Sequence, residues 1–312
     1  MKGRKTKKQN TFGALLGEMT EAKASGWSYS LLAIAITVAS FAFLVVFGAI
    51  GVNVVEVSRT DWYLYCSYLV SPLAFGCTVW AVLSMTKTPL QAELKRQTCK
   101  AKYFLLSVLL QIGLLSLSEL NSLFLEFLSI FGYENAGLSI PSLNGMGFVG
   151  VLFVVAVLPA IFEEWVFRGL LLKGMHSFGR VGAVLISGAL FALYHQNPAQ
   201  TVYQFCCGVG FALVALRAGS FLPTVVSHFI NNALIITLYK FGVTTFAPPV
   251  YIIILCVSVV CLAAALLWLF VFDKQAEKMQ ENREEQKHFW MGAMLGIVIF
   301  GLVWLSVLFK GI

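Results

Sequence analysis

The stretch Val151-Leu-Phe-Val-Val-Ala-Val-Leu-Pro-Ala-Ile-Phe-Glu163-Glu164-Trp-Val-Phe-Arg168-Gly169 decides the fold class, because it places two adjacent carboxylates inside a run of apolar residues. Charged side chains at membrane depth are costly and rare, and they usually face a bundle interior or a cavity. We therefore expect Glu163 and Glu164 to face a polar interior rather than lipid. Folding a membrane bundle does not require such a pair, so the stretch indicates a site for chemistry.

The composition indicates a polytopic membrane protein. Hydrophobic residues make up 59% of the 312 and charged residues 12%, whereas soluble domains are about a quarter charged. A net charge of +7 would suggest nucleic acid as a partner of a soluble protein, but lysines and arginines that orient membrane loops account for it here. The expected surroundings are therefore a lipid bilayer, without nucleic acid. The seven cysteines form no CxxC pair, which favours buried packing roles over a disulfide framework.

Runs of about 20 apolar residues, the length that crosses a bilayer, predict an all-α fold. We expect a polytopic bundle of eight or nine transmembrane helices with a buried polar active site. The predicted spans are 28–52, 62–86, 103–125, 146–172, 181–197, 201–217, 220–240, 250–272 and 290–309. The last span is equally well described as a helix appended to an eight-span core, because 273–286 is polar.

Basic residues alternate between the predicted loops and so predict the orientation. They gather in the N-terminal arm and in every second loop, whereas the other loops contain only Arg59 and Lys240. By the positive-inside rule, the N-terminus and the basic loops are cytoplasmic. No organelle-retention signal ends the chain, which favours a bacterial plasma membrane.

The two glutamates are predicted to have different roles. Neighbouring residues on a helix point about 100° apart. Glu164 shares a face with Arg168 at i+4, so the two charges can pair. Glu163 has no such local partner and suits a group that takes a proton from water and returns it. The alternative for Glu164 and Arg168 is a structural ion pair at the cytoplasmic end of the helix.

Two further predicted spans contain histidines. His195 shares a helix face with Phe191, and a lone histidine on such a face is also explained by packing. For His195 to meet Glu163, the fourth helix has to continue to about Met175.

The second histidine, His228, shares a face with Asn232. An imidazole N–H and an amide aimed at one point can bind an oxyanion. Helix–helix hydrogen bonding is the alternative for this pair, and it is the preferred interpretation for the neighbouring Asn231.

The motifs Glu163-Glu164-x-x-x-Arg168, Phe191-x-x-x-His195 and His228-x-x-x-Asn232, in this order on separate spans, resemble those of the CPBP family. These are the CAAX-processing and bacteriocin-processing intramembrane endopeptidases, also called Abi proteins. The resemblance covers about 146–240. It implies an enzyme, a peptidase that cleaves peptide bonds of membrane-associated substrates such as CAAX-like proteins or leader peptides.

The resemblance also implies roles for individual residues. Glu163 and His195 would activate a water, and His228 and Asn232 would stabilise the oxyanion. Three further residues would hold the site in shape, namely Glu164, Arg168 and Phe191. This mechanism needs no cofactor. The alternative is a zinc ion bound by Glu163, His195 and His228, which are suitable ligand types.

Two other functions remain open at this point. One is a membrane scaffold or regulator of a partner such as a sensor kinase, and the other is a transporter with a Glu and His proton relay. Transporters often contain internal repeats, and we find none. The predicted division is a basic cytoplasmic arm at 1–27, a transmembrane protease domain at 28–272 with its motif core at 146–240, a polar cytoplasmic connector at 273–289 and an additional transmembrane helix at 290–312.

Overall fold

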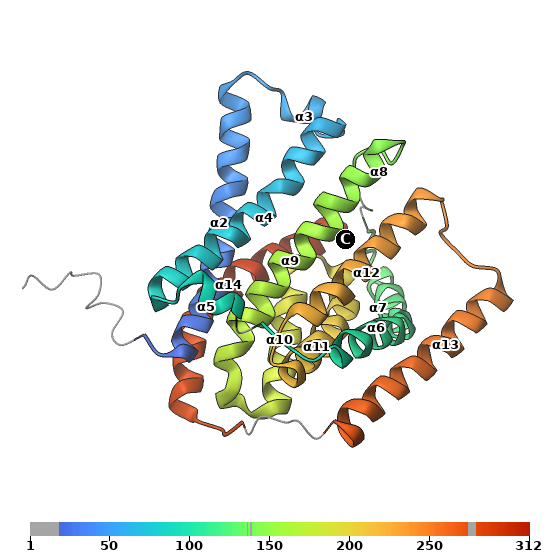
Figure 1. The fold of residues 1–312 in the computed structure, drawn as a ribbon. Coiled ribbons are helices and arrows are strands. Elements are labelled where there is room, and N and C mark those ends of the chain that lie inside the picture. Colours follow the sequence, from blue (N-terminus) through green and yellow to red (C-terminus); the bar gives the residue numbers. More distant parts are fainter. Residues whose placement is uncertain (1–18, 96, 136, 138, 274–278) are drawn as a thin grey trace, which may run out of the picture.

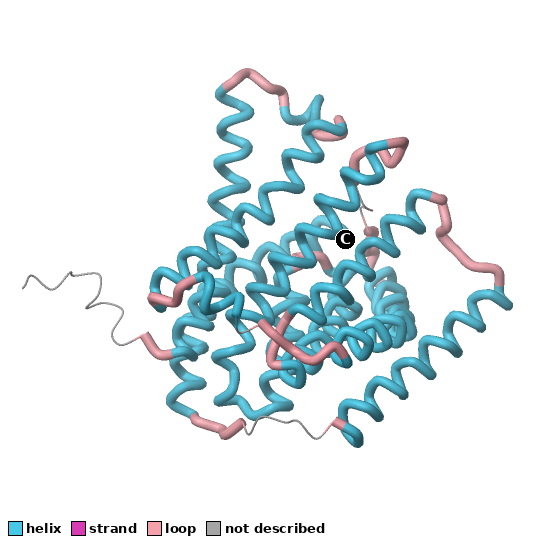
Figure 2. Tube along the Cα trace, in the orientation of Figure 1, coloured by secondary structure: helices cyan, strands magenta, loops and turns pink. Residues whose placement is uncertain are grey.

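The structure is a computed structural model that describes residues 19–95, 97–135, 137, 139–273 and 279–312. Within these residues it contains helices and no strand, which confirms the all-α prediction (Figures 1 and 2). Most basic residues of the predicted arm lie outside the described residues. The main helices are α2 (Glu21–Ala49), α4 (Asp61–Thr86), α6 (Lys102–Leu114), α7 (Ser118–Ser129), α8 (Met146–Val151), α9 (Leu158–Glu164), α10 (Gly179–Tyr194), α11 (Thr201–Ala218), α12 (Leu222–Lys240), α13 (Pro248–Leu267) and α14 (Arg283–Gly311).

Shorter helical segments connect or extend these helices. They are α3 (Val54–Val57), α5 (Leu90–Lys95), η1 (Leu115–Leu117), η2 (Leu152–Val157), η3 (Trp165–Leu171), η4 (Leu172–Phe178), η5 (Pro198–Gln200) and η6 (Trp268–Phe272). Three of them, η2, η3 and η6, are π-helical, and η2 and η3 stand on either side of α9. Such wide turns are rare and are frequent at functional sites, and nothing in the hydrophobic pattern predicts them.

Eight helical stretches of the described chain are long and apolar enough to cross a membrane, which agrees with the predicted eight or nine spans. The predicted fourth and fifth spans lie together in the stretch Met146–Tyr194. This stretch reverses at Gly179, whose φ of 67° is readily adopted by glycine. After the reversal, α10 packs against η4 and η3.

This reversal brings Glu163 and Tyr194 to the same depth. The first lies 16 residues before Gly179 and the second 15 residues after it, which is about 23 Å along each limb at 1.5 Å per residue. The first limb remains helical through η4 to Phe178. The continuation to Met175 that the sequence required is therefore present.

Loop contacts define the two ends of the bundle. At one end, the Asn282 backbone N–H donates to the Ser177 carbonyl at 3.0 Å. At the other, the Glu134 N–H donates to the Gly311 carbonyl at 2.8 Å. The last helix therefore runs the full depth of the bundle and ends beside the loop that follows α7.

The helix α14 packs most extensively against α2. Their backbones are close, because a Cβ at Gly292 would lie 2.6 Å from the Trp27 nitrogen, and the Ser30 hydroxyl donates to the Gly292 carbonyl at 2.5 Å. Small residues commonly allow such close approach between membrane helices. The α14 helix begins at Arg283, inside the predicted connector, and α2 begins at Glu21, inside the predicted arm.

Candidate active site

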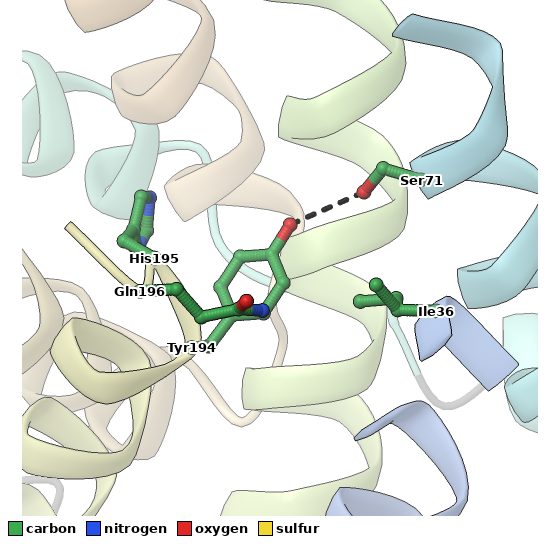
Figure 3. A pocket seen from close by; sticks show the side chains of 5 residues that line it. All are labelled: Ile36, Ser71, Tyr194, His195 and Gln196. Atoms are coloured by element: carbon green, nitrogen blue, oxygen red, sulfur yellow. Dashed lines mark hydrogen bonds between the residues drawn. The ribbon is translucent and has the colours of Figure 1, made fainter. Parts of the chain in front are cut away.

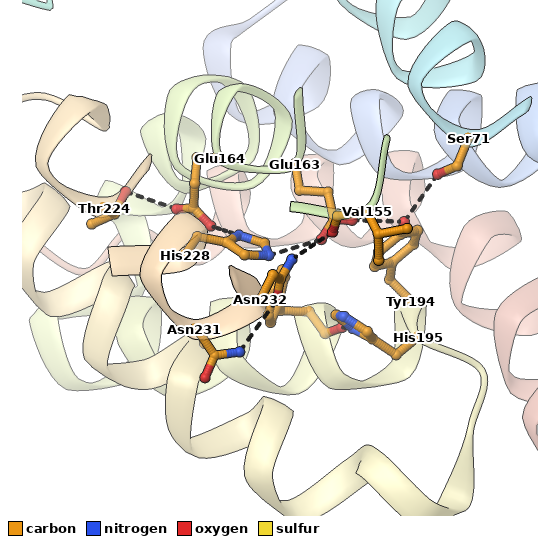
Figure 4. A network of polar contacts seen from close by, with 12 residues as sticks. Ser71, Val155, Glu163, Glu164, Tyr194, His195, Thr224, His228, Asn231 and Asn232 are labelled. Atoms are coloured by element: carbon orange, nitrogen blue, oxygen red, sulfur yellow. Dashed lines mark hydrogen bonds and ion pairs between the residues drawn. The ribbon is translucent and has the colours of Figure 1, made fainter. Parts of the chain in front are cut away.

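The two glutamates end α9, and both are buried in the interior of the bundle, with 6% and 0% of their surface exposed. Helices α10 and α12 bring the two histidines toward this position (Figure 4). As expected, the neighbouring carboxylates have different surroundings. Glu164 is enclosed by partners, whereas Glu163 is incompletely paired.

The Glu164 carboxylate accepts three close hydrogen bonds. One oxygen, Oε1, accepts from Arg168 Nη1 at 2.7 Å and from His228 Nδ1 at 2.9 Å. The other, Oε2, accepts from the Thr224 hydroxyl at 2.7 Å. A buried ion pair is retained only when further hydrogen bonds satisfy its remaining atoms, and here they come from α12.

The Arg168 guanidinium is held on several sides. Besides Glu164 it donates to the Gly208 carbonyl at 3.3 Å. Its carbon lies 4.3 Å from the centre of the Phe191 ring and 5.3 Å from that of Phe211, which are cation–π distances. The same two rings lie 5.9 Å from the His228 imidazole. Phe191 thus packs against both Arg168 and His228, which donate to Glu164.

Glu163 is the less satisfied carboxylate. Its Oε1 accepts from the Tyr194 hydroxyl at 3.2 Å. Its Oε2 is buried and has no hydrogen-bond partner among the described residues, although His228 Nε2 lies 3.8 Å away. Since His228 Nδ1 faces the Glu164 carboxylate, which only accepts, Nδ1 carries a hydrogen and Nε2 is the nitrogen that can gain or lose one.

The charges of the site are balanced in two protonation states. With Glu163 ionised and His228 protonated, two carboxylates face two cations, because Glu164 and Arg168 supply the other pair. With the proton on Glu163 instead, both Glu163 and His228 are neutral, and the net charge of the four side chains is again zero. Neither arrangement of charges leaves a net charge buried in the site, which would be costly.

His195 lies beside the glutamates but does not contact Glu163. Its Nδ1 is 2.8 Å from the Phe191 carbonyl oxygen, so Nδ1 carries the hydrogen and Nε2 keeps a lone pair. No hydrogen bond joins His195 and Glu163, both of which are described. Tyr194 connects them, because its ring centre lies 5.0 Å from that of His195 while its hydroxyl contacts Glu163.

Asn232 and Asn231 are hydrogen-bonded to each other, because Asn231 Nδ2 donates to Asn232 Oδ1 at 3.3 Å (Figure 4). Asn232 Nδ2 donates to the Val155 carbonyl at 3.2 Å, which leaves its second N–H without a partner among the described residues. Asn231 Oδ1 accepts from Gln111 and from the Tyr203 hydroxyl, both at 2.9 Å. Asn231 therefore joins three helices, which is the helix–helix role preferred from the sequence.

Three polar residues of the site were not predicted, and two of them have a signal in the sequence. Thr224 precedes His228 by four residues and so shares its helix face. Tyr194 lies as far after Gly179 as Glu163 lies before it. The third, Ser71 on α4, is 3.2 Å from the Tyr194 hydroxyl, and no motif indicates it.

The zinc alternative does not fit this arrangement. Across the described residues, no group of three or more His, Cys, Asp or Glu side chains could hold a metal ion. No step that follows depends on a metal.

A pocket of about 280 Å³ lies beside Tyr194, whose hydroxyl contacts Glu163 (Figure 3). Its lining comes from α2, from α4 and from the end of α10, namely Ile36, Ser71, Tyr194, His195 and Gln196. Four of these five side chains are polar. The pocket contacts Tyr194 and His195, so it gives a ligand access to the residues beside Glu163.

Comparison with known proteins agrees with the motifs. The family described as Type II CAAX prenyl endopeptidase Rce1-like matches residues 145–234, which contain all three motifs. Over this segment, the predicted relationship to the CPBP family is confirmed. No curated protein and no solved structure matches the chain. The eight apolar stretches support an integral membrane protein, and the segment 145–234 is similar to a family of peptidases.

Proposed function

We propose that this chain is an intramembrane endopeptidase that hydrolyses peptide bonds of membrane-associated substrates, either CAAX-like proteins or leader peptides. The observation that carries the proposal is the buried Glu163 Oε2, which has no hydrogen-bond partner in the described chain and lies 3.8 Å from His228 Nε2. A carboxylate kept incompletely paired beside an imidazole suits proton transfer. A structural ion pair would instead be satisfied, as Glu164 is.

In the proposed reaction, Glu163 is the general base. Its Oε2 takes a proton from water while the water oxygen attacks the scissile carbonyl carbon. His195 assists by accepting a hydrogen bond from the water through the lone pair of Nε2. The proton then passes from Glu163 to the amine nitrogen as the C–N bond breaks.

His228 and Asn232 are the proposed oxyanion donors. When protonated, His228 can donate from Nε2, because Glu164 holds Nδ1 at 2.9 Å. Asn232 can donate its second amide hydrogen, because the first is bonded to Val155. Both donors come from α12, so their relative position is set by one helix, as preorganised stabilisation of an oxyanion requires.

The test is turnover of quenched peptides by purified protein in lipid nanodiscs, comparing wild type with Glu163→Gln. The substitution keeps the shape and removes the proton acceptor, so cleavage should fall by at least ~10²-fold with an unchanged melting temperature. A chelator should have no effect. Full activity in Glu163→Gln contradicts the mechanism, and a wild type that binds peptides without cleaving them favours the scaffold alternative.

We also propose a cytoplasmic N-terminus in a bacterial plasma membrane. The described loops at the end of the bundle that contains Gly179 are rich in lysine and arginine, whereas the opposite end contains only Arg59, Lys240 and Lys310 among the described residues. Cysteines introduced one at a time at positions 95 and 144 test this in intact cells. An impermeant thiol reagent should label position 144 alone, and strong labelling at 95 would reverse the orientation.

A further inference from the structure

The pocket beside Tyr194 contains a residue with a costly backbone conformation. Gln196 has a φ of 52°, a region that residues other than glycine seldom adopt. It follows the last turn of α10, where its N–H donates to the Leu193 carbonyl at 3.1 Å. Glycine would make the same turn without the cost, so the turn alone does not explain a glutamine. Strained positions of this kind cluster at functional sites.

The side chain of Gln196 is available to a ligand. It lines the pocket beside Tyr194 (Figure 3), and its amide forms no hydrogen bond with any residue in the described part of the chain. An amide offers both an acceptor oxygen and a donor NH₂ group. A peptide backbone offers the complementary pair, one N–H and one C=O per residue.

The lining argues against an isoprenoid as the occupant. Ser71, Tyr194, His195 and Gln196 all present polar groups to about 280 Å³ of space, and only Ile36 is apolar. An apolar chain placed there would leave the Gln196 amide and His195 Nε2 without hydrogen-bond partners, which is unfavourable. An extended peptide segment would instead pair with them.

We propose that this pocket is the subsite for the peptide backbone next to the scissile bond, and that Gln196 holds this backbone through paired hydrogen bonds of its amide. This inference rests on the proposed endopeptidase function and specifies where its substrate lies. A segment bound to Gln196 would pass Tyr194, whose hydroxyl contacts Glu163 at 3.2 Å. The subsite would therefore bind the peptide backbone and make no contact with the lipid group attached to the substrate.

The decisive variant is Gln196→Gly, which removes the amide and also relieves the positive φ. We expect KM for a quenched peptide ending in Cys-aliphatic-aliphatic-X to rise about tenfold, as for the loss of a good hydrogen-bonding contact, with the melting temperature unchanged or higher. The effect should be equal for the S-farnesylated and the unmodified peptide. A purely structural role predicts a lower melting temperature and unchanged KM, which would overturn the proposal.

Lys87→Gly is the matched control, because Lys87 is the other non-glycine residue with positive φ in the described chain, at 54°. It caps α4 away from the pocket, so KM should not change. Binding of the labelled peptides to Glu163→Gln protein, with and without Gln196→Gly, separates two failures. Absence of cleavage in wild type overturns the proposed function, whereas an equal Kd with and without the amide overturns the subsite. A loss confined to the farnesylated peptide would assign the pocket to the lipid and also overturn it.

Discussion

The two halves of the site are built from adjacent glutamates and differ in how far their polar atoms are paired. In the enclosed half, Glu164 is bonded to Arg168, His228 and Thr224 at 2.7–2.9 Å. In the open half, Glu163 has one hydrogen bond, from Tyr194, and Tyr194 in turn lines the pocket. Burial is nearly complete for both carboxylates, so burial alone does not distinguish a structural charge from a chemical one.

The difference in pairing indicates the division of labour. A buried charge with a full set of partners is fixed in one protonation state, and moving it costs the energy of those contacts. A buried carboxylate with a free oxygen can accept a proton without breaking a contact. The enclosed half therefore holds His228 in place, and the open half is left to exchange protons with a substrate or water.

The largest effect should come from the enclosed half, through Glu164→Gln. The amide removes the negative charge and leaves Arg168 buried without its counterion, and breaking such a pair costs about 3–5 kcal/mol. We expect a strong fall in melting temperature and in the yield of folded protein. Thermal unfolding in detergent measures it.

Glu163→Gln is the matched control, because the same substitution one residue earlier should leave the melting temperature unchanged. Adding Arg168→Leu to Glu164→Gln should recover part of the lost stability, since it removes the stranded charge. If Glu164→Gln kept its melting temperature and lost only activity, the enclosed half would take part in the chemistry and the contrast between the halves would fail.

The next effect concerns Asn232, which borders the open half. Asn232→Ala removes the proposed amide donor and should lower kcat by about 10²–10³-fold, the usual range for one oxyanion donor. The neighbouring Asn231 provides the control, because it is bonded to Gln111 and Tyr203 and contacts Asn232 only at its acceptor Oδ1, at 3.3 Å, and not at the proposed donor. Asn231→Ala should lower the melting temperature and leave most of kcat. Similar kcat losses in both variants would assign Asn232 to helix packing.

The sequence predicted the enclosed half better than the open half. Glu164 and Arg168 are four residues apart, so their contact is local and follows from helix geometry. The burial of Glu163 followed from its place in an apolar run. The contact between His228 and Glu164 joins two helices that are 64 residues apart in the chain, and no single-helix pattern sets that register.

The open half depends on tertiary structure that the sequence pattern does not report. Its position follows from the reversal at Gly179, which sets Tyr194 against Glu163, and from α2 and α4, which contribute Ile36 and Ser71 to the pocket. Ser71 is one of many serines in apolar helices and has no distinguishing neighbour in the sequence. The π-helical turns around α9 are likewise invisible to a pattern of apolar residues.

The smallest expected effect concerns Tyr194, which lines the pocket and donates a hydrogen bond to Glu163, the proposed general base. Tyr194→Phe removes the hydroxyl that contacts Glu163 and Ser71 and keeps the ring, which packs 5.3 Å from Phe75 and from Phe167. We expect kcat to fall about tenfold, equal to ~1.4 kcal/mol, because Glu163 loses the bond that orients it. KM and the melting temperature should change little.

Tyr29→Phe is the control for this substitution, since the buried Tyr29 hydroxyl donates to the Leu190 carbonyl at 2.9 Å and does not contact the glutamates. Tyr29→Phe leaves the buried Leu190 carbonyl without this hydrogen bond, which should lower the stability by about 1–3 kcal/mol. It should not change kcat. If Tyr194 positions Glu163 and Tyr29 does not, Tyr194→Phe should lower kcat with little change in melting temperature, and Tyr29→Phe should lower the melting temperature with little change in kcat. A Tyr194→Phe variant with normal kcat would show that Glu163 is oriented without it, and would place Tyr194 among the packing residues of α10.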